Sequence, residues 1–276
     1  MRKAVVHRGK ELLEQGQGFA LAKVLETSGS TPRKSGAWLL VEENGSSIGT
    51  IGGGTLEAEV IKIAFDTLAY RENRVHEFSL TPGDHGGIDM RCGGNVKVAV
   101  SYVDPDHREE LDEGLGQQPK VYVFGAGHVA KALVPILHDV EFDTVVIDDR
   151  AEFANSIRFP ESELIVSHEY TKLIPSLVMD VESYIVIVTR GHSYDLEVLR
   201  EAIKKPAAYI GMIGSRKKIA HTFAQLEGEG VSRDTLTKVH TPIGIEIGAE
   251  TPEEIAISIA AELISIRSSR REGKRV

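Results

Sequence analysis

The chain has 276 residues, of which 41% are hydrophobic and 26% charged, as is typical of a globular protein with two domains. Its formal net charge of -9 argues against a general nucleic-acid-binding protein, which would need a basic surface. A single cysteine excludes an internal disulfide, and no stretch is apolar for long enough to cross a bilayer. We therefore expect a soluble, cytoplasmic protein that binds neither nucleic acid nor a membrane.

The first half, residues 1–104, predicts a smaller α+β domain. Its first residues favour a helix, and β-prone runs broken by Gly, Ser, Pro and Asn turns follow. Apolar residues then recur at helical spacing from about Gly54 to Tyr70. Two more strand candidates, RVHEFSL and NVKVAVSYV, enclose a glycine-rich segment that contains the cysteine.

The second half, residues 119–276, differs in its pattern. Residues 105–118 before it are polar and acidic, and we interpret them as a linker. Beyond them, short apolar strands such as KVYVF, TVVID and SYIVIVT alternate with helices. This alternation predicts a parallel sheet covered by helices on both faces, in a Rossmann-like α/β domain.

The strongest motif opens this second half. In VYVFGAGHVA, an apolar strand runs directly into Gly125, Gly127 and Ala130, and a helix follows. This G-x-G-x-x-A pattern allows a tight turn and the close approach of a pyrophosphate, and Asp148 at the end of TVVID is placed to accept from ribose hydroxyls. Arg150 could instead meet a ribose phosphate, so NAD and NADP both stay open. So does a Rossmann fold that serves only as a scaffold.

A second glycine cluster lies in the first half. Gly52, Gly53 and Gly54 lead into the predicted helix that carries Glu57, and the N–H groups at a helix N-terminus favour an anion. The alternative is a tight turn that needs small residues, and spacing does not separate the two. Earlier in the chain, the segment TSGSTPRKSGA precedes a predicted strand. Its polar residues suit a phosphate or a carboxylate, or form a solvated turn: Ser30, Thr31, Arg33 and Lys34.

Two polar segments follow strands of the second half, at the edge where a parallel sheet binds its ligand. TRGHSYD offers Arg190, His192 and Asp195, although Asp195 could simply cap a turn. IGSRKK offers a group that could also be an exposed helix face: Ser215, Arg216, Lys217 and Lys218. His128 and His192 are the titratable groups that an NAD(P)-dependent oxidoreductase could use as acid or base. The spacing of histidine and cysteine predicts no protein-held zinc site.

Taken together, these motifs resemble the XdhC/CoxI family, accessory proteins that mature molybdenum hydroxylases such as xanthine dehydrogenase. The resemblance extends over most of the chain. It is carried by ETSGSTPRKSGAWLLV, GTIGGGTLE, RCGG, VFGAGHVA, VIDDR, TRGHSYD, YIGMIGSRKK and PIGIEIGAETPEEIAISIAAEL.

The resemblance implies a chaperone that binds the molybdenum cofactor, a pterin dithiolene phosphate complex. Such a protein protects the cofactor while a cysteine desulfurase installs the sulfido ligand, and then passes it to the hydroxylase apoenzyme. It also implies a homodimer and no turnover by the chain itself. The Rossmann motif read in isolation favours an NAD(P)-dependent oxidoreductase instead.

The cysteine has an unusual setting for a structural residue. Cys92 lies between Arg91 and the pair Gly93-Gly94, and not in an apolar run. The arginine would stabilise the thiolate, and the glycines would let a ligand approach closely. We therefore predict that Cys92 lies near the molybdenum or its sulfido ligand, and we name it as the candidate metal ligand. The alternative is a small residue packed at a strand start.

Overall fold

The computed structural model describes residues 2–31, 35–80, 93–107, 111 and 118–271. The chain divides into two compact units, Met1–Gln117 and Gln118–Val276. Within the described residues, no helix combines the length and the apolar character needed to cross a membrane.

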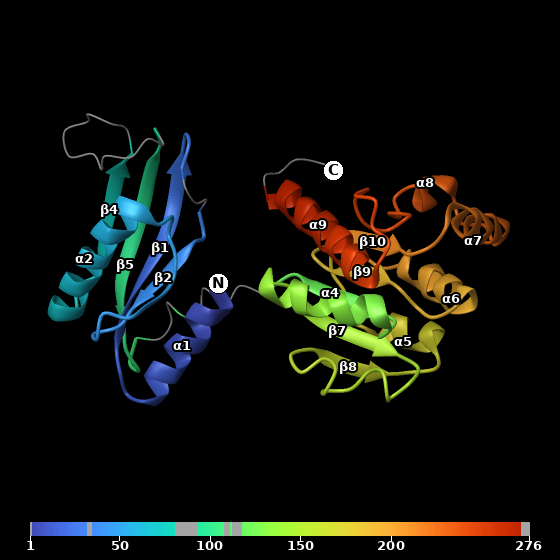
Figure 1. Cartoon of the computed structure of the whole chain (residues 1–276), viewed down its shortest axis with the longest axis horizontal. Helices are drawn as coiled ribbons and strands as arrows, with labels where there is room; N and C mark the ends of the chain where they lie inside the picture. Colours follow the sequence, from blue (N-terminus) through green and yellow to red (C-terminus); the bar gives the residue numbers. More distant parts are fainter. Residues whose placement is uncertain (1, 32–34, 81–92, 108–110, 112–117, 272–276) are drawn as a thin grey trace. The chain divides into compact units, whose positions relative to one another are not determined.

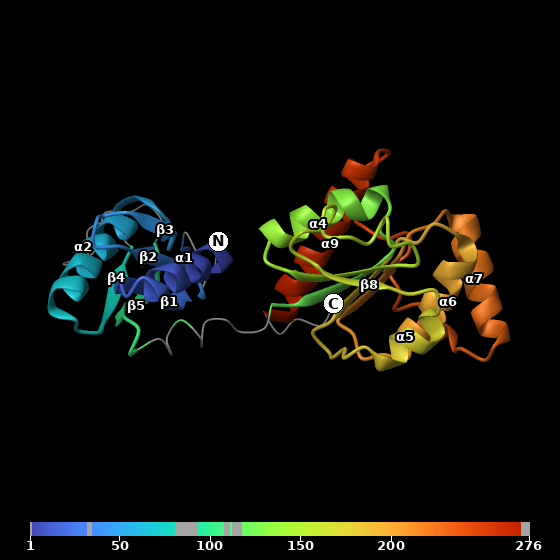
Figure 2. The same ribbon diagram turned by 90° about the horizontal axis from the view of Figure 1, so that it is seen from below.

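The first unit is a five-stranded antiparallel sheet with a helix on each face (Figures 1 and 2). Along the sheet the strand order is β3-β2-β1-β5-β4. The elements are α1 (Arg2–Glu14), β1 (Phe19–Ser28), β2 (Trp38–Val41), β3 (Ser47–Gly49), α2 (Gly54–Tyr70), β4 (Arg74–Ser79) and β5 (Asn95–Val103). These bounds agree with the predicted helix and with both predicted strands.

Alternation along β1 explains why this sheet carries two cores. Ala20 and Ala22 pack with the buried face of α2, whereas Phe19 and Leu21 pack with the buried face of α1. Successive side chains of a strand point to opposite faces, so one strand can serve both helices.

The second unit is a five-stranded parallel sheet in the order β10-β9-β6-β7-β8. Its strands are β6 (Lys120–Phe124), β7 (Asp143–Asp148), β8 (Glu163–Val166), β9 (Tyr184–Ile187) and β10 (Tyr209–Met212). Its helices are α4 (His128–Asp139), α5 (Tyr170–Ser176), α6 (His192–Ala202), α7 (Arg216–Gly228), α8 (Arg233–Leu236) and α9 (Pro252–Arg271). The predicted Rossmann-like α/β fold is confirmed.

Helices cover both faces of this sheet (Figure 1). The core on one face joins α4 and α9 to residues such as Val121 and Val123, while the other joins α5, α6 and α7 to Tyr122 and Phe124. The chain places β7 and β8 on one side of β6 and β9 and β10 on the other. The strand order therefore reverses between β6 and β9, and in such sheets the crevice at the carboxyl ends beside this point is where ligands bind.

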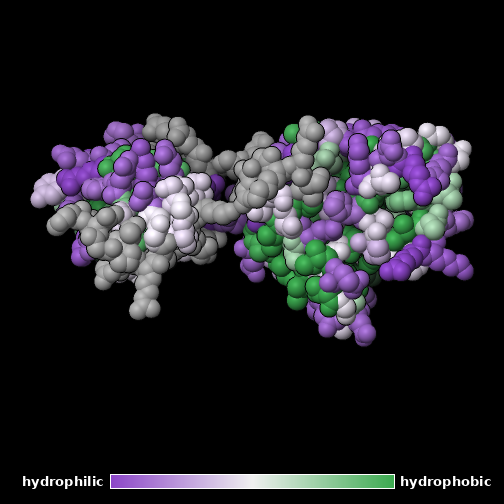
Figure 3. Space-filling model, turned by 90° about the horizontal axis from the view of Figure 1, so that it is seen from above, coloured by the Kyte–Doolittle hydropathy of each residue, from purple (hydrophilic) through white to green (hydrophobic). Residues whose placement is uncertain are grey.

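Some large apolar side chains of the second unit stay on its surface. Ile257 and Ile264 are exposed on α9, and Ile245 and Ile247 are exposed in the segment before it. The Ser258 hydroxyl donates to the Ile245 carbonyl at 2.6 Å, which holds that segment against the helix. Figure 3 shows apolar atoms gathered on part of the second unit's surface. We call the four exposed isoleucines, Ile245, Ile247, Ile257 and Ile264, the α9 apolar face.

Candidate functional site

The glycine turn after β6 lies at the switch point of the second sheet. Gly125 has φ +107°, and a Cβ there would lie 2.4 Å from the carbonyl oxygen of Val188. Only glycine fits this position, because the turn packs directly against the chain leaving β9. Gly127, by contrast, would place a Cβ in open space, with nothing within 4 Å. It precedes α4, and no side chain caps that helix. The helix start is therefore open to an anion.

Asp148, at the end of β7, turns its carboxylate toward the protein's own chain. Its Oδ2 accepts from the Ala126 N–H at 2.7 Å and from Arg150 Nη2 at 3.0 Å. Its Oδ1 accepts from the Arg150 N–H at 3.0 Å and from Arg150 Nε at 2.8 Å. The residue is only 3% exposed. Four donors thus use the roughly four lone-pair positions of a carboxylate.

The ionised form of Asp148 is favoured despite this burial. Burial acts to raise its pKa, but the hydrogen bonds from Arg150 and from the Ala126 N–H outweigh burial and hold the pKa below the ordinary value. Asp148 is therefore a charged clamp on the glycine turn. That it accepts from ribose hydroxyls stays a prediction, and its hydrogen-bonding capacity is already used within the chain.

Asp149 gathers two arginines at the same edge of the sheet. Arg190, which follows β9, donates to its Oδ2 at 2.6 Å, and Arg150 Nε lies 3.7 Å from its Oδ1. The Asp149 side chain is 4% exposed, whereas that of Arg190 is 48% exposed. A buried carboxylate thus holds a solvent-facing guanidinium at the carboxyl ends of β7 and β9.

A third arginine holds the glycine turn from its other side. Arg158 Nη2 donates to the Ala126 carbonyl at 3.0 Å. Its guanidinium lies 5.0 Å from the centre of the Phe153 ring, and the Arg150 guanidinium lies 3.6 Å from the same centre. The Ala126 peptide is therefore fixed by Asp148 through its N–H and by Arg158 through its carbonyl.

The two polar segments predicted to follow strands meet through a buried ion pair. Asp195 is fully buried, and its Oδ1 accepts from the Thr189 hydroxyl at 2.6 Å. Its Oδ2 accepts from the Lys218 ammonium of α7. Asp195 and Lys218 thus join the ends of β9 and β10, and their pairing accounts for both residues structurally.

The remaining predicted residues of this region have separate positions. The Ser215 hydroxyl caps α7 by accepting from the Lys218 N–H at 3.3 Å. Arg216, Lys217 and His128 are exposed. His192 begins α6, and its side chain lies outside the described part of the chain.

The glycine run of the first unit forms a turn whose N–H groups donate to Glu57 of the helix that follows. Gly52, Gly53 and Gly54 all have positive φ values, of 141°, 74° and 62°. The Glu57 carboxylate accepts from the Thr50 hydroxyl at 2.5 Å and from the N–H groups of Ile51 and Gly53 at 3.2 Å. This arrangement favours the turn interpretation for Glu57, because its carboxylate occupies donors that an anion would use.

The glycine pair of the first unit packs on the chain that leaves β1. A Cβ on Gly94 would lie 2.5 Å from the Ser28 carbonyl oxygen and 2.6 Å from that of Ser30. Gly93 and Gly94 also exchange hydrogen bonds with Leu80, of 3.2 Å and 2.8 Å. Leu80 and Gly93, the described residues on either side of 81–92, are therefore adjacent. The predicted site residues Arg33, Lys34, Arg91 and Cys92 lie outside the described residues.

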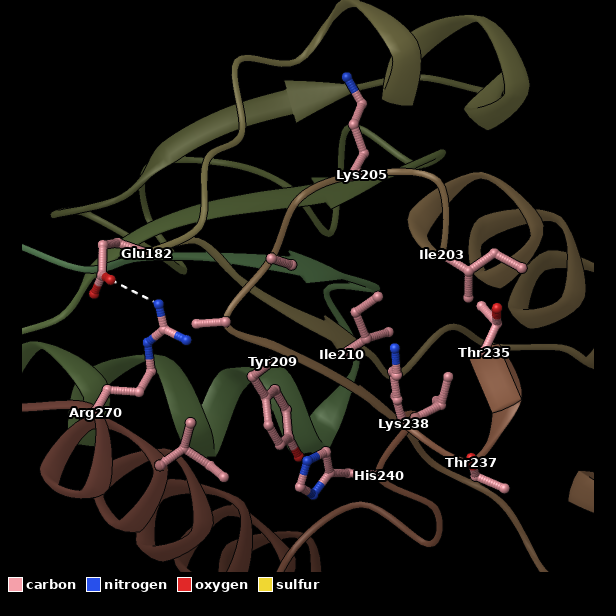
Figure 4. Close-up of a pocket in the computed structure, with 14 residues that line it drawn as sticks. Glu182, Ile203, Lys205, Tyr209, Ile210, Thr235, Thr237, Lys238, His240 and Arg270 are labelled. Atoms are coloured by element: carbon pink, nitrogen blue, oxygen red, sulfur yellow. Dashed lines mark hydrogen bonds and ion pairs between the residues drawn. The ribbon is translucent and has the colours of Figure 1, made fainter. Parts of the chain in front are cut away.

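A separate cavity of about 990 Å³ lies at the β10 edge (Figure 4). Its walls include Tyr209 and His240, whose ring centres are 4.5 Å apart. Glu262 of α9 accepts from the Tyr209 hydroxyl and lies 2.9 Å from His240 Nδ1. Sequence patterns did not single out this group, because its members are brought together only by packing. Among the predicted site residues that the structure describes, none lines this cavity.

Metal ligands are not grouped in what the structure describes. Among these residues there is no cluster of three or more His, Cys, Asp or Glu that could hold a metal ion.

Two family models match the chain in the expected order. One, described as the XdhC Rossmann domain, matches residues 121–263. The other, described as the XdhC and CoxI family, matches residues 12–79.

Three curated proteins are similar to the chain. YqeB of Escherichia coli (strain K12) is 33% identical over 264 residues, which cover 95% of this chain and 46% of YqeB. The chain thus spans less than half the length of that relative. A Bacillus subtilis (strain 168) protein, named as a probable xanthine dehydrogenase subunit, is 22% identical, with coverage of 93% and 95%. The molybdenum cofactor insertion chaperone PaoD of Escherichia coli (strain K12) is 21% identical, with coverage of 95% and 87%.

A solved structure supports the fold. A crystal structure described as a xanthine dehydrogenase from Bacillus halodurans matches with a TM-score of 0.78 and 22% identity, over 96% of each chain.

Proposed function

Because the chain belongs to the XdhC family, we propose that it is a maturation chaperone for the molybdenum cofactor. It holds and protects the cofactor during sulfuration and delivers it to a xanthine dehydrogenase-type hydroxylase. The observation that carries this proposal is the match of both family models, supported by relatives named for xanthine dehydrogenase and for cofactor insertion. The chain needs no chemical turnover of its own for this role.

The donors around the glycine turn fit a phosphate-bearing cargo. A protein with a net charge of -9 must bind an anion through local groups and not through its overall field. The open start of α4 and the exposed guanidinium of Arg190 supply such groups at one edge of the second sheet. We place the phosphate end of the cargo there.

Cys92 is the residue we propose for the metal end of the cargo. A thiolate beside Arg91 would be stabilised by the positive charge, and the thiolate is the form that ligates metals or exchanges sulfur. The next described residues, Gly93 and Gly94, are hydrogen-bonded to Leu80, and Gly94 packs against the chain that leaves β1.

Delivery requires contact surfaces for other proteins. We propose the hydroxylase apoenzyme and a cysteine desulfurase as partners, and a homodimer as the working form. The α9 apolar face is a candidate for one of these contacts, since grouped exposed isoleucines are a feature of interaction surfaces. Light scattering after size exclusion tests the dimer, and a clean monomer at micromolar concentration contradicts it.

The function is tested by purification from cells that make molybdopterin, followed by identification of the bound ligand. We expect bound molybdopterin with the wild-type chain. We expect the Cys92→Ala variant to lose the molybdenum or its sulfido ligand while melting at the same temperature as the wild type. An Arg200→Gln variant is the control, because Arg200 of α6 pairs with Glu229, away from the glycine turn. Absence of molybdopterin together with NAD(P)H consumption on a small carbonyl would instead support an oxidoreductase.

A further inference from the structure

We infer that the crevice at the carboxyl ends of β6, β7 and β9 binds a phosphomonoester and not the ribose diol of a nucleotide. The inference deepens the proposed function and rests on it for the identity of the cargo. It rests on the described side chains for the chemistry of the site.

The first step is the loss of the diol acceptor. A dinucleotide-binding Rossmann domain uses the carboxylate after its second strand to accept from ribose hydroxyls. Here that carboxylate belongs to Asp148, and four donors from Ala126 and Arg150 surround it. A ribose diol would have to displace these charge-assisted hydrogen bonds from a buried group, and the displaced donors would lose their partner.

The second step is the pair of guanidiniums held by Asp149. Arg190 and Arg150 approach the two different oxygens of this one carboxylate, at 2.6 Å and 3.7 Å. The two positive groups therefore lie close together although like charges repel, because a buried carboxylate offsets their repulsion. An arginine fork matches phosphate oxygens, and Arg190 is the member of the pair that faces solvent.

The third step is the charge balance. Three arginines, Arg150, Arg158 and Arg190, lie near Asp148, Asp149 and the exposed Glu152, so the charged side chains balance before the start of α4 adds its partial positive charge. Arg158 also has a buried Nε with no hydrogen-bond partner within the part of the chain that the structure describes. A phosphomonoester carries about -1.5 to -2 charges near neutral pH, whereas a diester carries about -1, so the positive end of α4 and the unpartnered Arg158 Nε favour the more highly charged monoester.

Two ligands share this chemistry. One is the phosphate of the pterin cofactor, and the other is the 2′-phosphate of NADP. The probes must therefore separate monoester from diester and also one source from the other.

The test is titration calorimetry with matched pairs of ligands. The first pair is 5′-AMP and its methyl phosphodiester, which differ in one ester bond. The second pair is NADP⁺ and NAD⁺, and released molybdopterin is then used as a competitor. We expect 5′-AMP to bind about tenfold or more tightly than the diester, the size of effect that one charge-assisted hydrogen bond supplies. We also expect this preference to shrink below about pH 6, where the monoester takes up its second proton.

Variants locate the effect. Arg190→Gln is expected to weaken binding of the monoester more than binding of the diester, and so to reduce the monoester preference, and Arg190→Lys to keep part of that preference. Arg200→Gln is the matched control because it also removes one arginine from an ion pair. All variants are first required to melt as the wild type does.

The outcomes separate the two proposals. Equal binding of monoester and diester by the wild type overturns the inference, and so does an Arg190→Gln variant that weakens both equally. If molybdopterin co-purifies without any such preference, only this inference fails. If the preference holds, NADP⁺ binds better than NAD⁺ and molybdopterin neither co-purifies nor competes, the phosphomonoester site stands and the proposed function fails.

Discussion

Replacing Asp148 by alanine should destabilise the second unit more than the first. The change removes four hydrogen bonds of 2.7 to 3.0 Å, leaves the Ala126 N–H without its acceptor, and leaves the Arg150 guanidinium with only the 3.7 Å approach to Asp149. Removing one partner of a buried charge pair costs about 3–5 kcal/mol, and we take about 3 because Arg150 keeps some contact with water. For a unit of this size that corresponds to a fall in Tm of roughly 6–12 °C.

The assay is thermal and urea unfolding of the full chain, monitored with a probe that reports on the second unit. Asp148→Asn is the comparison, because an amide oxygen can still accept from Ala126 while the charge is lost, and about half of the effect should remain. The low pKa of Asp148 means that its contribution is present above the unfolded-state pKa and is lost as the pH falls through the folded-state value. The difference between wild type and variant should therefore close below about pH 4. If the free energy of unfolding of the alanine variant lies within about 0.5 kcal/mol of the wild-type value at pH 7, Asp148 does not clamp the glycine turn.

Three further changes test other parts of the fold. Gly125→Ala should cost about 2 kcal/mol or more, because its Cβ would lie 2.4 Å from the Val188 carbonyl oxygen at a φ of +107°; an unchanged urea midpoint contradicts this. Glu262→Gln should cost about 1–3 kcal/mol at pH 7. Burial acts to raise the pKa of Glu262 but its hydrogen-bond donors hold it low, so this loss should vanish in acid; a loss that is constant with pH would argue against the charge. Glu42→Gln removes the charge from a paired hydrogen bond with Arg8, at 2.9 Å to each oxygen, and should lower only the first unit's transition by about 1–2 kcal/mol. Differential scanning calorimetry checks which transition moves.

The fold could be predicted from the sequence because its signals are local. The strand before Gly125, the helix after Gly127 and the strand ending at Asp148 each show their own apolar pattern, and their order determines a parallel sheet. The spacing of Gly125 and Gly127 also indicates the turn after β6. A positive φ and a close approach of the backbone at Gly125 leave few residue types other than glycine that fit there.

The direction of side chains at the site could not be predicted in the same way. The sequence places Asp148 at a strand end where a ligand is predicted to bind, but the donors toward which its carboxylate turns depend on where Ala126 comes to lie in the folded chain. Asp195 and Lys218 lie in separate segments of the sequence, and only the packing of α7 beside α6 pairs them. Such pairs are set by tertiary contacts, for which one sequence holds no periodic signal.

The group formed by Tyr209, His240 and Glu262 could be predicted from the sequence even less. Glu262 and His240 are 22 positions apart, and they meet because α9 packs beside the edge of β10. Neither residue type is unusual for an exposed helix or a loop, so no composition rule separates them from their neighbours.

The hydrogen bonds that join the residues on either side of segment 81–92 have a consequence for how this protein can change over generations. Leu80 is hydrogen-bonded to Gly93 and Gly94, so the sheet itself holds the two ends of the segment together. Gly94 has no room for a side chain, so this position cannot vary without disturbing the chain that leaves β1.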